Sequence, residues 1–119
     1  MLEFRNALGE LITLLTWLAP TQNVDGSDID YALTYRLYVD AAPVSTFPGS
    51  LNPDGRYQYP LADVAALSVP GEYALTLTAF PEGTDLETKP ELESDQSNAI
   101  TITAILVRVP KEPTDLSTE

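Results

Sequence analysis

The sequence contains no cysteine and no histidine among its 119 residues. The absence of cysteine excludes disulfides, thiolate metal ligands and cysteine nucleophiles. The absence of histidine excludes the usual zinc sites and Ser-His nucleophile pairs. The fold must therefore depend on packing, for which a hydrophobic content of 44% is sufficient.

Positive charge is scarce. Six Lys and Arg residues stand against 18 Asp and Glu residues, which gives a formal net charge of −12 at pH 7. Such a surface repels phosphate backbones and anionic lipid, so we expect no nucleic-acid partner. We interpret the charge as a means of remaining soluble at high local concentration.

Long hydrophobic runs are also missing. The leucine-rich stretch at residues 11–19 is far shorter than the roughly 20 apolar residues that cross a bilayer. Glu3 and Glu10 precede it and no basic region does, unlike a signal peptide. We therefore expect neither membrane insertion nor secretion by a signal peptide.

The sequence does contain several runs in which apolar and polar residues alternate, as in Y-A-L-T-L-T-A-F at residues 73–80. This period of two is typical of half-buried strands, and the ten prolines fall mainly between the runs. The pattern predicts an all-β, two-sheet antiparallel sandwich of about seven strands. The residues expected in its core are Leu15, Trp17, Tyr35, Leu37, Tyr73, Leu75, Leu77, Ile100 and Ile102.

The length indicates one domain. We expect residues 1–9 to form an N-terminal arm or a first edge strand, and residues 10–107 to form the sandwich. Residues 108–119 are rich in proline and charge, which predicts a flexible acidic tail.

Two groups of acidic residues are candidate sites. Asp25, Asp28 and Asp30 alternate in D-G-S-D-I-D, which raises the question of a calcium site. The spacing lacks the EF-hand order and Asp-Gly is a common turn sequence, so we expect a turn and no metal or other cofactor. Residues 81–96 are strongly acidic, and we expect a solvated loop, with steering toward a basic surface as the alternative.

The second expected strand is apolar on both faces. If Leu15 and Trp17 face the core, then Ile12, Leu14 and Leu18 point out of the other side of their sheet. A strand of this kind implies that something covers its outer face. We therefore predict a docking face at Ile12, Leu14 and Leu18, covered by the N-terminal arm, by the long segment at residues 40–67 or by another protein.

Four segments, in this order, resemble a fibronectin type III domain of the kind found in bacterial and phage proteins. They are L-L-T-W-L-A-P-T-Q-N-V-D-G-S (14–27), Y-R-L-Y-V (35–39), P-G-E-Y-A-L-T-L-T-A-F (70–80) and E-S-D-Q-S-N-A-I-T-I-T (93–103). The resemblance covers residues 10–105 and implies a core tryptophan at Trp17 and a tyrosine corner at Tyr73. The sequence departs from the family at residues 40–67, a section longer than usual, and at Val69, which precedes Pro70 where a leucine is usual.

The resemblance, together with the expected absence of a signal peptide, implies a virion structural protein made in the host cytoplasm. We expect a non-enzymatic capsid decoration protein on the exterior of a phage particle. Its expected partner is the major capsid protein, and an oligomer in the assembly is possible. The alternatives are a bacterial surface or secreted module that binds glycan or protein through its loops, and a phage tail or neck accessory. The carboxylates fall in loops at the rim of a small sandwich, so we expect no catalytic site.

Overall fold

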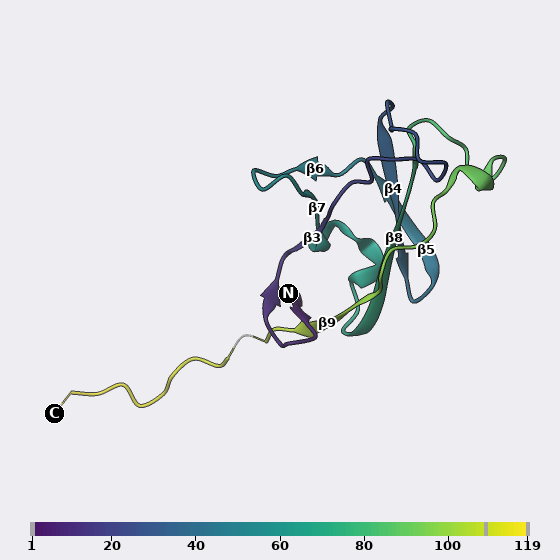
Figure 1. The fold of residues 1–119 in the computed structure, drawn as a ribbon. Helices are drawn as coiled ribbons and strands as arrows, with labels where there is room; N and C mark the ends of the chain where they lie inside the picture. The colour runs from purple at the N-terminus through teal and green to yellow at the C-terminus, as the bar shows by residue number, and fades with distance from the viewer. Residues whose placement is uncertain (1, 109, 119) are drawn as a thin grey trace.

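A computed structural model describes residues 2–108 and 110–118 (Figure 1). Met1, Val109 and Glu119, which fall in the expected arm and tail, lie outside the described residues. The described residues are all-β, apart from three short 3₁₀ helices, and their strands form two antiparallel sheets that make a β-sandwich. The strands are β1 (Leu2–Asn6), β2 (Leu11–Ile12), β3 (Leu14–Trp17), β4 (Leu33–Val39), β5 (Ala42–Phe47), β6 (Ser50–Leu51), β7 (Tyr57–Pro60), β8 (Gly71–Pro81) and β9 (Ile100–Leu106).

The larger sheet has the strand order β2-β1-β9-β8-β4-β5. Its centre is β8, an 11-residue strand that pairs with β4 on one side and with β9 on the other. The alternation predicted for these three strands holds in β4, where Tyr35, Leu37 and Val39 are buried. The smaller sheet has the order β3-β7-β6.

The core lies between the sheets. Leu15, Tyr35, Leu37, Leu75 and Ile102 are buried in it. Trp17, Tyr73 and Leu77 are partly buried and pack against it. Ile100, which we expected in the core, is 40% exposed, so that prediction is wrong. It has the same alternation as the buried Ile102, but it lies at the start of β9, where its side chain lines two open cavities.

The segment between β7 and β8 supplies core residues that alternation does not reveal. Two consecutive 3₁₀ helices, η1 (Leu61–Asp63) and η2 (Ala65–Leu67), place Leu61, Val64 and Leu67 inside the sandwich. A 3₁₀ helix has three residues per turn, so side chains three positions apart share one side. Leu67 thus fills the core ahead of Pro70, while Val69 stays 62% exposed.

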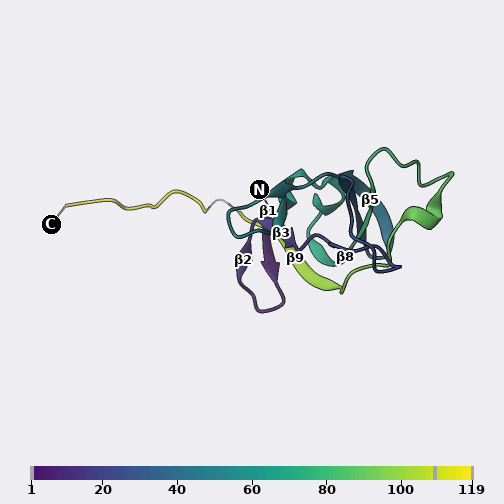
Figure 2. The same ribbon diagram turned by 45° about the horizontal axis from the view of Figure 1, so that its top comes forward.

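The second expected strand is divided. Its first part, β2, joins the larger sheet beside β1, and its second part, β3, joins the smaller sheet beside β7. The chain changes sheets at Thr13, and this division, with the short strand β6, raises the count to nine strands in the described residues. β1 pairs with both β2 and β9, so β2 is the edge strand of the larger sheet (Figure 2). The N-terminal strand β1, which we expected at the edge, lies inside the sheet.

The two ends of the molecule differ in character. The β1–β2 hairpin and the start of the C-terminal tail lie at one end, and the loop at residues 82–92, which includes η3 (Pro90–Leu92), lies at the other (Figure 1). Residues 110–118 are exposed, contain no helix or strand, and lead away from the body. Within the described ranges we find no helix with the length and apolar character to cross a membrane.

Candidate functional site: an open groove beside β3

One edge of the smaller sheet is unpaired. β3 pairs with β7 on one side only. The N–H of Leu61 donates to the carbonyl of Thr13, so the backbone groups of Thr13, Leu15 and Trp17 face β7. By the same alternation, the backbone groups of Leu14 and Thr16 point away from the sheet. Such an edge is a ready partner for another strand.

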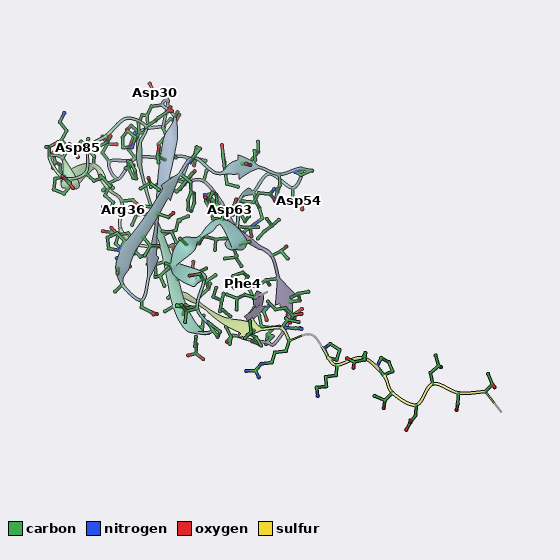
Figure 3. All side chains as sticks on the ribbon, turned by 180° about the vertical axis from the view of Figure 1, so that it is seen from behind. Phe4, Asp30, Arg36, Asp54, Asp63 and Asp85 are labelled. Atoms are coloured by element: carbon green, nitrogen blue, oxygen red, sulfur yellow. The ribbon has the colours of Figure 1, made fainter. Side chains whose placement is uncertain are left out.

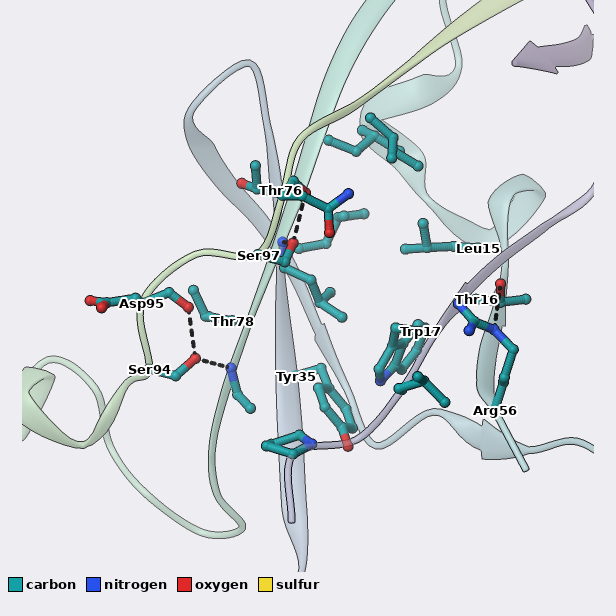
Figure 4. Close-up of a pocket in the computed structure, with 18 residues that line it drawn as sticks. Leu15, Thr16, Trp17, Tyr35, Arg56, Thr76, Thr78, Ser94, Asp95 and Ser97 are labelled. Carbon is teal, nitrogen blue, oxygen red and sulfur yellow. Dashed lines mark hydrogen bonds between the residues drawn. The ribbon is translucent and has the colours of Figure 1, made fainter. Parts of the chain in front are cut away.

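A groove follows this edge between β3 and the start of β9. It consists of two adjoining cavities of about 540 and 590 Å³ that share Leu15, Thr16 and Ile100. The first cavity continues to Trp17, Leu18, Pro20, Tyr35, Leu75 and Leu77, and the second to Leu8, Ile12, Leu14, Leu61 and Ile102. We call the two together the β3 groove, and Figure 4 shows the first cavity.

The floor of the first cavity is aromatic. Trp17 meets Tyr35 edge to face, with ring centroids 4.9 Å apart, and is tilted against Phe47 at 5.8 Å. Gly49, with φ of +71°, lies so close to the indole that a Cβ there would come within 2.7 Å of the ring. A side chain at position 49 would therefore displace Trp17, and the sequence Pro48-Gly49 provides the turn that avoids this.

Trp17 contributes an unsatisfied polar atom to this groove. Its Nε1 is buried and has no hydrogen-bond partner. The indole N–H lies near enough to the Tyr35 hydroxyl to lower the pKa of that group, although not in hydrogen-bond geometry; burial has the larger effect and raises that pKa overall. A buried N–H without an acceptor lowers the stability of the fold.

The wall opposite β3 is built by serine side chains. Ser94 and Ser97 accept hydrogen bonds from the backbone N–H groups of Ala79 and Leu77 through their hydroxyl oxygens, at 2.9 and 3.0 Å. Their own N–H groups donate to the carbonyls of the same two residues. The segment at residues 93–99 thus runs beside β8 without being a regular strand, and it forms one side of the groove (Figure 4).

The groove carries almost no charge. Its first cavity contains one cation and one carboxylate, Arg56 and Asp95, and its second contains neither. The guanidinium of Arg56 donates from Nε to Thr16 Oγ1 at 3.4 Å and has no ion-pair partner among the described residues. On a chain with a net charge of −12, this is a near-neutral apolar surface.

The predicted docking residues do not form one outer face, so that prediction is wrong in its geometry. Ile12 is in the larger sheet and packs against the core. Leu14 and Leu18 are 40% and 67% exposed. Because the chain changes sheets at Thr13, the three side chains line the β3 groove at different points.

We expected the acidic segment at residues 81–96 to be a solvated loop, but part of it contacts the sheet. Glu93 folds back onto the outer face of β4 and β8, where its Oε2 accepts hydrogen bonds from the hydroxyls of Tyr38 (2.5 Å) and Thr78 (2.6 Å). Its Oε1 lies 3.7 Å from Arg36 Nη1. The pKa of Tyr38 is raised by burial and, to a lesser extent, by this bond to a carboxylate.

The remaining acidic candidates form a turn. Gly26 N–H donates to the Asn23 carbonyl, and Asp25 Oδ1 accepts from the N–H and hydroxyl of Ser27. These bonds lower the pKa of Asp25. Asp28 and Asp30 are exposed, and no group of three or more acidic residues that could hold a metal occurs in residues 2–108 and 110–118.

Comparison with protein-family models, with curated proteins and with solved structures finds no match.

Sequence reasoning missed Arg56, Leu8 and Glu93 as residues of interest. Arg56 stands in the turn sequence D-G-R, and only the pairing of β3 with β7 brings it beside Thr16. The sequence did contain one signal for Glu93. Glu93 begins the segment E-S-D-Q-S, whose two serines are three residues apart and can hold the segment against a strand.

Proposed function

We propose that the protein is a fibronectin type III-like module that serves as a non-enzymatic structural protein on the exterior of a phage particle, as a capsid decoration protein. The family assignment is supported by the hydroxyl of Tyr73, which donates to the Val69 carbonyl four residues upstream, as in a tyrosine corner. It is also supported by Trp17, which packs between the sheets.

The observation that carries the proposed function is the difference between the ends of the molecule. Exposed apolar side chains occur on the β1–β2 hairpin, where Leu8 is 84% and Leu11 55% exposed, and on the neighbouring strand β9, where Ile105 and Leu106 are exposed. Leu14 continues this surface into the β3 groove. Monomeric proteins rarely expose such a surface unless it contacts a partner.

The opposite end is acidic. Around Asp85, labelled in Figure 3, the loop exposes further carboxylates and a single lysine, Lys89. In this proposal the hairpin end attaches to other virion proteins, and the acidic end faces outward, where its charge keeps particles apart.

The decisive experiment locates the chain in a reconstruction of the particle. The proposal predicts sandwich density in many copies across the outer shell, with the hairpin end inward. A single ring of copies would place the chain at a neck or tail instead. A chain absent from particles that binds cells or polysaccharide as a monomer would favour the adhesion alternative and contradict the proposal.

Variants test the orientation. Leu8→Asp and Leu11→Asp place a charge on the hairpin end, and we expect each to weaken binding to particles that lack the protein by at least about tenfold. Leu92→Asp makes the same change at the acidic end, where Leu92 is 42% exposed, and serves as the matched control. Equal loss from all three variants would contradict this orientation.

A further inference from the structure

The β3 groove has the form of a site for an additional strand. Its free edge offers the backbone groups of Leu14 and Thr16, and apolar side chains lie behind that edge. Strands that add to such an edge gain affinity from main-chain hydrogen bonds and specificity from alternate side chains. The occupant should therefore be an extended segment with an apolar residue between polar ones.

The exposed tail of the chain contains a segment of this kind. Residues 114–118 read T-D-L-S-T, so Thr114, Leu116 and Thr118 would share one face of a strand. Leu116 is 99% exposed and is the apolar residue of the tail at residues 110–118. Pro113 lacks an N–H, so an unbroken set of donors begins at Thr114.

We infer that residues 114–118 of one copy add as a strand to β3 of a second copy, with Leu116 in the β3 groove. Five residues of the tail match the length of residues 14–18. Asp115 has φ of 56°, so pairing has to straighten the backbone at that residue.

Charge favours the groove as the place where an acidic tail binds. The net charge of −12 repels such a segment over most of the surface, and the near-neutral groove is where that repulsion is weakest. Asp115 and Glu112 outnumber Lys111 in residues 110–118, and Arg56 at the groove has no carboxylate partner among the described residues. A tail in the groove supplies that partner.

Geometry favours the tail of another copy over the chain's own. β9 begins at Ile100, on the groove wall, and ends at Leu106, about 20 Å further along at the usual rise of a strand. The tail leaves from that far end and leads away from the body (Figure 3). A contact between the tail of one copy and the groove of the next is heterologous, so it builds rings or open chains. The inference rests on the groove and the tail alone, and does not depend on the proposed function.

The test uses the full chain over a range of concentrations, at a salt concentration that screens the net charge. Sedimentation velocity measures self-association. Fluorescence of Trp17, the one tryptophan in the chain, reports directly on the groove. We expect both signals to change together as concentration rises.

Two pairs of variants decide the contact. Leu116→Asp and Ser117→Asp add the same charge to opposite faces of the tail segment. Leu18→Asp and Val24→Asp add it at two exposed apolar positions, of which Leu18 lines the groove and Val24, in the 21–30 loop, does not. We expect Leu116→Asp and Leu18→Asp to weaken self-association at least about tenfold, and each control to change it far less.

Four results would overturn the inference. The first is a wild-type chain that stays monomeric up to about millimolar concentration, and the second is an equal effect of the two variants within each pair. The third is a Trp17 signal that depends on Leu116 but not on concentration, which would place the chain's own tail in the groove. The fourth is a loss with Leu18→Asp alone, which would indicate a different occupant. Leu116 is almost fully exposed, so its variant leaves the fold intact and keeps the test valid.

Discussion

The two surfaces that flank β8 differ in how their polar groups are paired and in how far they are covered. On the outer face, Glu93 gathers Arg36, Tyr38 and Thr78 under the acidic segment, and each of these polar groups has a partner. Toward β3, the sandwich stays open, and Trp17 keeps a buried N–H without an acceptor. The same segment serves both surfaces, because residues 93–99 close one and form a wall of the other. This difference shows that the open groove is a local feature and does not reflect poor packing throughout a small fold.

The largest expected effect compares a sealed core position with the open groove. Leu67 is 1% exposed and lines neither cavity, so Leu67→Ala should lower the free energy of unfolding by about 2–5 kcal/mol. Leu18→Ala should change it by no more than about 0.5 kcal/mol, because Leu18 is already exposed. Urea unfolding of dilute protein measures both. A similar loss from both variants would show that the groove is closed in solution.

Glu93 tests the sealed face. Glu93→Ala leaves two hydroxyls and a guanidinium without their acceptor, and should cost about 1–3 kcal/mol in unfolding free energy. Glu93→Gln keeps an acceptor oxygen and should cost less. The matched control is Glu91→Ala, an exposed carboxylate of the same loop, which should be nearly neutral. If thermal unfolding ranks Glu91→Ala with Glu93→Ala, the anchoring role of Glu93 is wrong.

The serines test the wall that the two surfaces share. Ser94→Ala and Ser97→Ala each remove an acceptor for a β8 N–H, and each should cost about 1 kcal/mol. Amide hydrogen exchange should increase at Ala79 in the first variant and at Leu77 in the second. Unchanged exchange at both amides would mean that backbone pairing alone holds the segment.

The smallest effect concerns alkaline pH. The pKa of Tyr38 and that of Tyr35 are raised in the fold, mainly by burial, so folding favours the neutral phenols. Their contribution to stability is complete below about pH 10, the unfolded pKa of tyrosine, and is lost as the pH rises through the folded values. Urea unfolding between pH 8 and 11 should show this decline, and Tyr38→Phe should make it shallower. A slope that Tyr38→Phe leaves unchanged would contradict the assignment.

Alternation predicted β4, β8 and β9 because neighbouring strands bury every second side chain, and that pattern is local. Ile100 shows the limit of this pattern, because its spacing is that of a core residue while its side chain lines the open β3 groove. Leu61, Val64 and Leu67 were missed because 3₁₀ spacing replaces alternation there.

The groove could be predicted only in part. Its apolar residues at Leu14 and Leu18 stood out in the sequence, yet their arrangement depends on the change of sheet at Thr13. The contact between Glu93 and Tyr38 joins residues 55 positions apart, and no local pattern specifies such a partner.

The pairing of β1 with β9 has a consequence for the order in which the chain folds during synthesis. Leu2 is opposite Leu106, so β1 cannot complete its pairing until the much later strand β9 has been made. Until then β1 has only the two-residue β2 as a neighbour, and an isolated hairpin of that size is marginal in water. Phe4, buried in the finished sandwich, therefore stays exposed until β9 has been made and the sheet closes around it.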